Sequence, residues 1–306
     1  MRESFKASAP GKLFLLGEHA VLQGRRCLVC AVNQRMSITV NPRRDHRVTI
    51  DSAMGRYQSD LAELRKEKPF LFVLTAIELH KEDLTHGFDL KIESDFSPTV
   101  GLGSSAAVTV AMTTALFALT GREIDPYVIY DHSFSAVRIV QGKGSGADVA
   151  ASAFGGVLLY RMLPHELSAF HLVHPITVVY SGSKTPTTTV IDLVSKTRDQ
   201  FPEQMNMIYD IMDSSAKYAA ASIGRNDWET VGRFLNMNQG LMDAIGVSNK
   251  ILSGIAYDLR DDPGILGSKI SGSGLGDCVI GLGKLKQDSA YDPLPIEMSL
   301  GGCRID

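Results

Sequence analysis

The chain has 306 residues, 44% of them hydrophobic and 21% charged, and its formal net charge is −3 at pH 7. This length is sufficient for two lobes with substantial apolar cores. No basic surplus indicates a nucleic-acid partner, and no uninterrupted apolar stretch reaches the length of a membrane span. The first five residues also lack the apolar core of a signal peptide. We therefore expect a cytoplasmic protein that binds neither nucleic acid nor membranes.

The first half of the chain is predicted to alternate strands with helices. A proline and several polar residues at 161–165 mark the expected lobe boundary, which divides the chain into 1–164 and 165–306. Strands are expected at 5–16 (broken by a Pro10-Gly11 turn), 28–40, 47–51, 87–94 and 156–161, and helices at 60–82, 106–119 and 126–141, with a short Ala-rich helix after residue 148.

The second half is predicted to be richer in helices. Strands are expected at 169–174, 176–181 and 278–282, and helices at 189–200, 203–223, 228–245 and from a Ser248 cap to 260. Strands crossing to helices in both halves, together with several antiparallel hairpins, indicate a two-lobed α+β fold.

The four cysteines are too few and too scattered for a disulfide framework. Cys27 and Cys30 have the spacing of a metal or redox pair. They lie on a predicted strand, however, where side chains three residues apart point to opposite faces. We expect buried thiols.

A glycine-serine turn at residues 98–107 is the most informative stretch of the sequence. It joins the strand at 87–94 to the helix at 106–119, so backbone N–H groups are expected to point outwards at the positive end of the helix dipole. Gly101 and Gly103 allow a ligand close to the main chain, and Ser104 and Ser105 add hydroxyls for phosphate or Mg²⁺. The turn matches neither a Walker A loop nor a dinucleotide fingerprint, and glycines here could also serve only the connection.

The chain contains three glycine-rich motifs. In chain order they are residues 9–19 (APGKLFLLGEH), 98–107 (PTVGLGSSAA) and 269–278 (KISGSGLGDC). This arrangement resembles the GHMP kinases, which phosphorylate small molecules, and the resemblance covers nearly the whole chain. It implies an N-terminal lobe of the ribosomal S5 domain 2-like type that binds ATP, a C-terminal lobe of the ferredoxin-like type, and an active site in the cleft between them. A homodimer is common in that family, while the sequence itself leaves the oligomeric state open.

The resemblance also implies which residues bind MgATP and act on it. Lys12 and Asp148 match the catalytic pair, with Asp148 accepting the proton of the acceptor hydroxyl and Lys12 stabilising charge, and an ion pair between them is expected. Alone, Lys12 could be an exposed strand lysine and Asp148 a helix cap. The nucleotide-binding residues would be Gly101, Leu102, Gly103, Ser104, Ser105 and Ala106, with Ser105 also a ligand of Mg²⁺.

Two segments resemble mevalonate kinases within the family: residues 17–21 (GEHAV) and 236–248 (NMNQGLMDAIGVS). They imply transfer of the γ-phosphoryl group of ATP to the C5 hydroxyl of mevalonate. His19 could equally be a satisfied histidine, and the hydroxyl-rich stretch after Ser183 could only cap a helix. The residues expected to bind the acceptor are Glu18, His19, Ser183, Thr187, Gly272, Ser273 and Gly274.

The sequence departs from that pattern in the third motif, where Leu275 and Asp277 replace glycines that the resemblance implies, and at the expected metal site. Mevalonate kinases usually carry a glutamate eleven residues before the catalytic aspartate, where it helps to hold Mg²⁺, and here that position is Val137. Residues 140–148 and 276–278 look more like phosphomevalonate kinase, which is the alternative enzyme. A GHMP-fold sensor that only binds ligands is the alternative of a different class.

Overall fold

The computed structural model describes residues 3–96, 100–287 and 289–306. Its larger sheet has the order β11-β1-β2-β5-β3-β4, with β6 paired to β2 and β7 to β6. Neighbours in it pair antiparallel, except β3 and β5, which are parallel. The strands are β1 (Phe5–Leu16), β2 (Cys27–Pro42), β3 (Arg47–Ser52), β4 (Gly55–Asp60), β5 (Phe88–Ser94), β6 (Val157–Arg161), β7 (Glu166–Phe170) and β11 (Arg304–Ile305).

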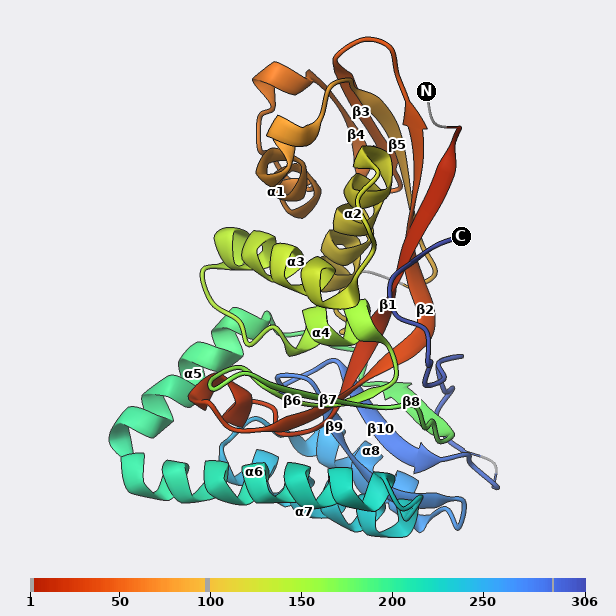
Figure 1. Ribbon diagram of the computed structural model, residues 1–306. Helices are drawn as coiled ribbons and strands as arrows, with labels where there is room; N and C mark the ends of the chain where they lie inside the picture. The colour runs from red at the N-terminus through yellow and green to blue at the C-terminus, as the bar shows by residue number, and fades with distance from the viewer. Residues whose placement is uncertain (1–2, 97–99, 288) are drawn as a thin grey trace.

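Four helices cover one face of this sheet, and α2 packs directly across β1 and β2 (Figure 1). They are α1 (Leu71–Leu79), α2 (Ser104–Thr120), α3 (Pro126–Gln141) and α4 (Ala147–Phe154). The Asp125 side chain caps α3 by accepting from the Tyr127 N–H, with Pro126 as the first residue of the helix. Gly121 ends α2 in the left-handed conformation.

The second lobe contains an antiparallel sheet of order β8-β10-β9, formed by β8 (Ile176–Tyr180), β9 (Ile265–Ser271) and β10 (Cys278–Gly283). Its helices are α5 (Thr187–Gln200), α6 (Pro202–Ile223), α7 (Trp228–Ala244) and α8 (Lys250–Asp261). The helices α7 and α8 pack on β9, and the long strands β1 and β2 run from the upper lobe towards this one (Figure 1). The two-lobed α+β prediction is confirmed.

Buried residues of both lobes form one continuous apolar cluster at the junction. Leu13 and Leu28 of the larger sheet lie in it with Leu235 of α7 and Ile280 of β10. Cys27 and Cys30 are buried free thiols, as predicted. Among the described residues, none of the helices is long and apolar enough to cross a bilayer.

Several predicted boundaries were wrong. Residues 5–16 form one strand with a register shift between Pro10 and Lys12, instead of two strands around a turn. Only Leu71–Leu79 of the segment 60–82 is an α-helix, because Pro69 disfavours helical backbone at the residue before it. Short 3₁₀ turns, η2 (Leu61–Glu63) and η3 (Lys81–Asp83), occupy its ends, and η1 (Ala20–Gln23) follows β1.

Further differences concern several strands and one helix cap. Strands β4, β9 and β11 were not predicted, and the strand expected at 169–174 is instead β7, which pairs with β6 and extends the larger sheet past residue 164. The division at 164 and 165 itself stays a prediction. Asn249, and not Ser248, caps α8, since the Asn249 carboxamide oxygen accepts from the Leu252 N–H.

Candidate active site

The turn before α2 places the N-terminus of this helix at a cleft lined by Gly101, Gly103, Ser104 and Ser105. Helix α2 begins at Ser104, directly after Gly103, which has φ 77° and makes no side-chain cap. The first N–H groups of a helix have no intrahelical acceptor, and the dipole makes this end positive, so the turn suits an anion. Pro98 and Thr99, the start of the predicted motif, lie outside the described residues.

Lys12 of β1 lies directly against this turn. Its backbone N–H donates to the Leu102 carbonyl (2.9 Å), and its Nζ donates to the Gly101 carbonyl (3.2 Å). The Nζ atom also lies 5.1 Å from the centre of the Phe14 ring. A Cβ atom on Gly103 would lie 3.0 Å from Lys12 Cε, so glycine leaves room for the lysine stem. Lys12 is therefore a buried lysine that contacts the glycine-serine turn before α2, and not an exposed one.

Asp148 is the second residue of α4 and is half-buried. Its Oδ1 accepts from the Val149 N–H at 3.0 Å. The expected ion pair with Lys12 does not form among the described residues, because Lys12 Nζ is turned to the Gly101 carbonyl instead. Both side chains nevertheless line the same cavity.

The loop that carries Asp148 is fixed by aromatic side chains beneath it. The Tyr160 hydroxyl donates to the Ser145 carbonyl at 2.5 Å, and the Tyr130 and Tyr160 hydroxyl oxygens are 2.8 Å apart. A Cβ atom on Gly146, which has φ 80°, would lie 2.8 Å from the Phe134 ring. Only glycine fits at residue 146. The close aromatic packing and the Tyr160 hydrogen bond together hold the start of α4 in place.

Glu18 forms a buried ion pair with Lys269 of β9, a residue that the sequence analysis did not assign to the site. Neither side chain is more than 2% exposed. Glu18 also accepts from the Gly272 N–H (3.4 Å) and the Asn238 side-chain amide (3.5 Å). Burial lowers the pKa of Lys269, and the Glu18 carboxylate opposes that shift. The Glu18 carboxylate therefore joins the first motif to the third.

His19 makes the second link between these motifs. Its Nε2 lies 2.8 Å from the Ser273 carbonyl oxygen, so this nitrogen carries the proton. The His19 backbone has φ 62°, a left-handed conformation that directs the side chain back toward the third motif. Burial lowers the pKa of His19, against the opposing effects of the Ser273 bond and Glu18. Burial thus favours the neutral form of the ring.

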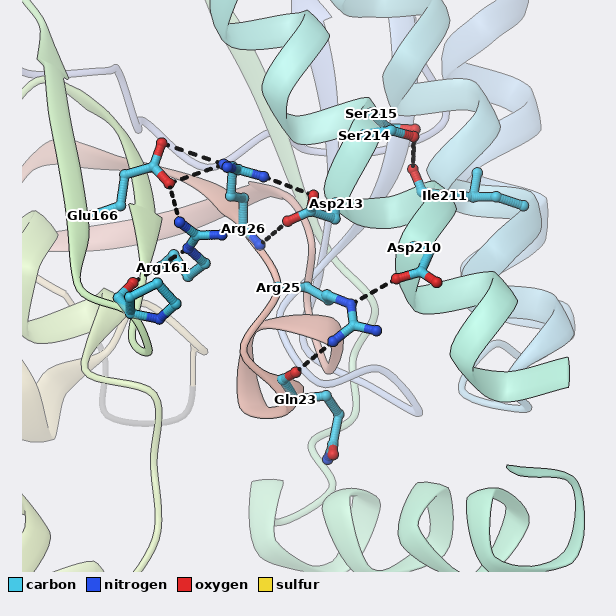
Figure 2. Close-up of polar contacts among 11 residues, drawn as sticks. Gln23, Arg25, Arg26, Arg161, Glu166, Asp210, Ile211, Asp213, Ser214 and Ser215 are labelled. Carbon is cyan, nitrogen blue, oxygen red and sulfur yellow. Dashed lines mark hydrogen bonds and ion pairs between the residues drawn. The ribbon is translucent and has the colours of Figure 1, made fainter. Parts of the chain in front are cut away.

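An ion-pair network holds the segment that follows His19 (Figure 2). Arg26 pairs with Asp213 of α6 (2.8 Å) and with Glu166 of β7 (3.0 Å). Arg161 also pairs with Glu166 (2.9 Å), and Arg25 pairs with Asp210 of α6 (2.8 Å). The network fixes η1, and with it the backbone that positions Glu18 and His19.

These segments enclose a cavity of about 510 Å³ between the lobes. Of the predicted site residues, it is lined by Lys12, Glu18, His19, Gly101, Gly103, Ser104, Ser105, Asp148, Thr187, Gly272 and Ser273. Leu102 and Ala106 are instead buried behind the turn, Ser183 is exposed beside the cavity, and Gly274 lies against the Val247 carbonyl.

Asp277 also lines the cavity and was not predicted as a site residue. It is 6% exposed and has φ 63°. Burial raises its pKa, while Lys184 and Lys12 oppose the shift. The only sequence signal was a carboxylate at a position of the third motif where the family has glycine.

The cavity can accept a nucleotide-bound Mg²⁺. No cluster of three or more His, Cys, Asp or Glu side chains suited to a metal occurs in the part of the chain that the structure describes. Mg²⁺ at nucleotide sites usually needs only one or two carboxylates besides phosphates and water. The buried Asp277 Oδ1 has no hydrogen-bond partner among the described residues, and Ser105 lies in the same lining, so the donor set fits.

Comparison with known proteins identifies the family. The GHMP kinases N terminal domain family matches residues 71–156, and the GHMP kinases C terminal family matches residues 219–299. A mevalonate kinase of Aeropyrum pernix is 31% identical over 93% of this chain and 90% of its own length. Mevalonate kinases of Thermococcus gammatolerans and Pyrococcus furiosus match 98% of the chain at 32% and 31% identity.

Solved structures share the fold at lower identity. The Methanococcus jannaschii mevalonate kinase has a TM-score of 0.82 at 20% identity and covers 97% of this chain and 98% of its own. The Streptococcus pneumoniae phosphomevalonate kinase in complex with phosphomevalonate and AMPPNP has a TM-score of 0.80 at 18% identity, covering 96% and 99%. From these matches and the three assembled motifs, the chain belongs to the GHMP kinase family.

Proposed function

We propose that the chain is an ATP-dependent mevalonate kinase, which transfers the γ-phosphoryl group of ATP to the C5 hydroxyl of mevalonate and releases 5-phosphomevalonate and ADP. The observation that carries the proposal is that Lys12, Asp148 and the start of α2 line one cavity. Curated relatives at 31%, 33% and 30% identity are mevalonate kinases, and this supports mevalonate as the acceptor.

Each residue has a role that its geometry supports. The N–H groups at the start of α2 bind the transferring phosphates, and Lys12 adds a positive charge beside them. Asp148 accepts the proton of the acceptor hydroxyl as the phosphoryl group leaves ADP. Mg²⁺, when bound, neutralises phosphate charge, and Ser105 is a proposed ligand. Glu18 and His19, held through Lys269 and Ser273, shape the acceptor end of the cavity.

Phosphomevalonate kinase is the alternative enzyme. It would need further cationic side chains to bind the phosphate group that its acceptor already carries. Lys143 lines the cavity, but its Nζ is paired with Asp192 of α5 at 2.6 Å. A coupled ADP-release assay with MgATP and, in parallel, mevalonate, 5-phosphomevalonate, galactose and homoserine decides among these acceptors. We expect turnover on mevalonate alone. Turnover on 5-phosphomevalonate alone would indicate a phosphomevalonate kinase instead. No ADP release with any of the four acceptors would favour a protein that only binds its ligands.

The role of Asp148 has its own test. We expect Asp148→Asn to lower kcat by about 10²–10⁴-fold, the usual contribution of a general base, with an unchanged melting temperature. Asp261→Asn is the matched control, because Asp261 is exposed at the end of α8 and does not line the cavity. Wild-type kcat in Asp148→Asn would mean that Lys12 and electrostatics suffice without a base.

We further propose a cytoplasmic location and a homodimer. The location is supported by four free cysteines, which are typical of a reducing compartment. The dimer rests on the family resemblance, and sedimentation velocity tests it.

A further inference from the structure

Asp277 has a fixed backbone and an unsatisfied carboxylate. Its N–H donates to the Ser183 carbonyl (2.8 Å), and its own carbonyl accepts from the Ser181 N–H (2.9 Å). Its Oδ1 is buried without a hydrogen-bond partner among the described residues. A buried carboxylate oxygen without a partner is costly, so it indicates a group that binds there in the functional state.

The carboxylate lies on the bare backbone of the phosphate turn. A Cβ atom on Gly101 would be 2.7 Å from Asp277 Oδ2 and 3.0 Å from Oδ1. Lys12 and Lys184 are near enough to favour its charged form. A carboxylate beside a phosphate site repels the phosphates unless a cation lies between them. Its position therefore matches a divalent cation that the phosphates and the carboxylate share.

The other acidic side chains of the cavity are committed elsewhere. Glu18 is paired with Lys269, and Asp148 is the proposed base at the start of α4. Val137, at the position where the family has a metal-holding glutamate, lines the same cavity with an apolar side chain. Asp131, the nearest acidic residue before it, is exposed and does not line the cavity.

We propose that Asp277 supplies the carboxylate ligand to the Mg²⁺ of bound nucleotide, in place of the acid missing at residue 137. The inference rests on the proposed function, because it requires MgATP in this cavity. The Mg²⁺ then makes few protein bonds, with phosphate oxygens and water completing its octahedron. The third motif thus contributes a metal ligand as well as backbone.

The test measures ADP binding by calorimetry with Mg²⁺ and with EDTA, and Mn²⁺ binding to the ADP complex by electron paramagnetic resonance. We expect Mg²⁺ to tighten ADP binding to the wild type. Asp277→Asn should reduce this enhancement about tenfold or more, since even outer-shell changes cost 10–100-fold in metal affinity. Metal-free ADP should bind the variant as well as the wild type or better, because a negative charge has been removed.

Asp277→Gly makes the same test without a folding problem, because glycine adopts φ 63° without strain. Asp261→Asn is the control for removal of a carboxylate elsewhere, since Asp261 is exposed at the end of α8. An unchanged Mg²⁺ enhancement in both Asp277 variants overturns the inference. Equal weakening of ADP binding with and without Mg²⁺ also overturns it, since that indicates a structural role. A wild type that binds no ADP under either condition instead refutes the nucleotide site and the proposed function itself.

Discussion

The buried ion pair between Glu18 and Lys269 gives the sharpest stability prediction. Lys269 is fully buried and Glu18 is 2% exposed, so neither charge is solvated. Lys269→Met keeps the length of the aliphatic stem and removes the charge, which leaves the Glu18 carboxylate with only two long hydrogen bonds, to Gly272 (3.4 Å) and Asn238 (3.5 Å). An uncompensated buried charge of this kind usually costs about 3–5 kcal/mol in the free energy of unfolding.

The double variant separates the pair from the packing around it. Glu18→Gln alone leaves a lone buried ammonium group and should also cost about 3–5 kcal/mol. The combined variant leaves no lone charge, so its cost should fall well below the sum of the two single costs, with a coupling of about 1–3 kcal/mol.

Urea unfolding followed by circular dichroism measures all four proteins of this cycle at pH 7. Lys250→Met is a control for loss of a lysine, because Lys250 is exposed at the start of α8. Single costs below about 1 kcal/mol, or costs that simply add, would refute the assignment of Glu18 to a structural ion pair. Glu18 would then be better explained as a residue that contacts only the acceptor.

Two further predictions concern the turn and the pH dependence of folding. Gly103→Ala should cost about 1–2 kcal/mol, because φ is 77° there, and should lower kcat by displacing the Lys12 stem. Gly240→Ala in α7, where an added Cβ meets nothing within 4 Å, is the control, and a wild-type kcat for Gly103→Ala would contradict the reasoning. Burial lowers the pKa of His19 from 6.5 in the folded protein. As the pH falls, the histidine of the unfolded chain therefore binds a proton before that of the folded protein does. The neutral His19 side chain therefore contributes to the stability of the folded protein above pH 6.5, and this contribution is lost as pH falls through the lowered pKa. His19→Gln should therefore lose less stability than the wild type between pH 7.5 and 5, and equal losses would exclude His19 as a cause.

The parts of the fold set by local pattern were predicted well. The helices α3 and α6 and the alternating strand β5 depend on caps, prolines and periodicity within a few residues. The expected break at Pro10-Gly11 was wrong because the strand continues through pairing with β2, a partner whose register is not readable from local sequence. Gly11 serves a long-range contact instead, since a Cβ atom there would lie 2.9 Å from the Leu102 carbonyl.

Most of the residues named from the motifs line the cavity, whereas two residues whose position depends on burial, Lys269 and Asp277, were not named. Lys12 and Asp148 line the cavity as the resemblance implies. In the sequence, nothing distinguishes Lys269 from other charged residues that precede a glycine-rich segment. Its partner Glu18 is 251 residues away, so only the folded chain shows that both charges are buried together. Asp277 was noticed as a departure, but its closeness to Gly101 depends on the packing of β10 against the turn.

The phosphate turn is held from two sides by segments distant in sequence. The first motif holds it through the Lys12 N–H and Nζ, and the third motif places Asp277 on Gly101. These two motifs are themselves joined by Glu18 and Lys269. Any shift of β9 and β10 relative to β1 therefore moves the proposed acceptor residues Glu18 and His19 together with the glycine-serine turn before α2. Such coupling explains physically why nucleotide and acceptor sites can share one cavity without a separate element to align them.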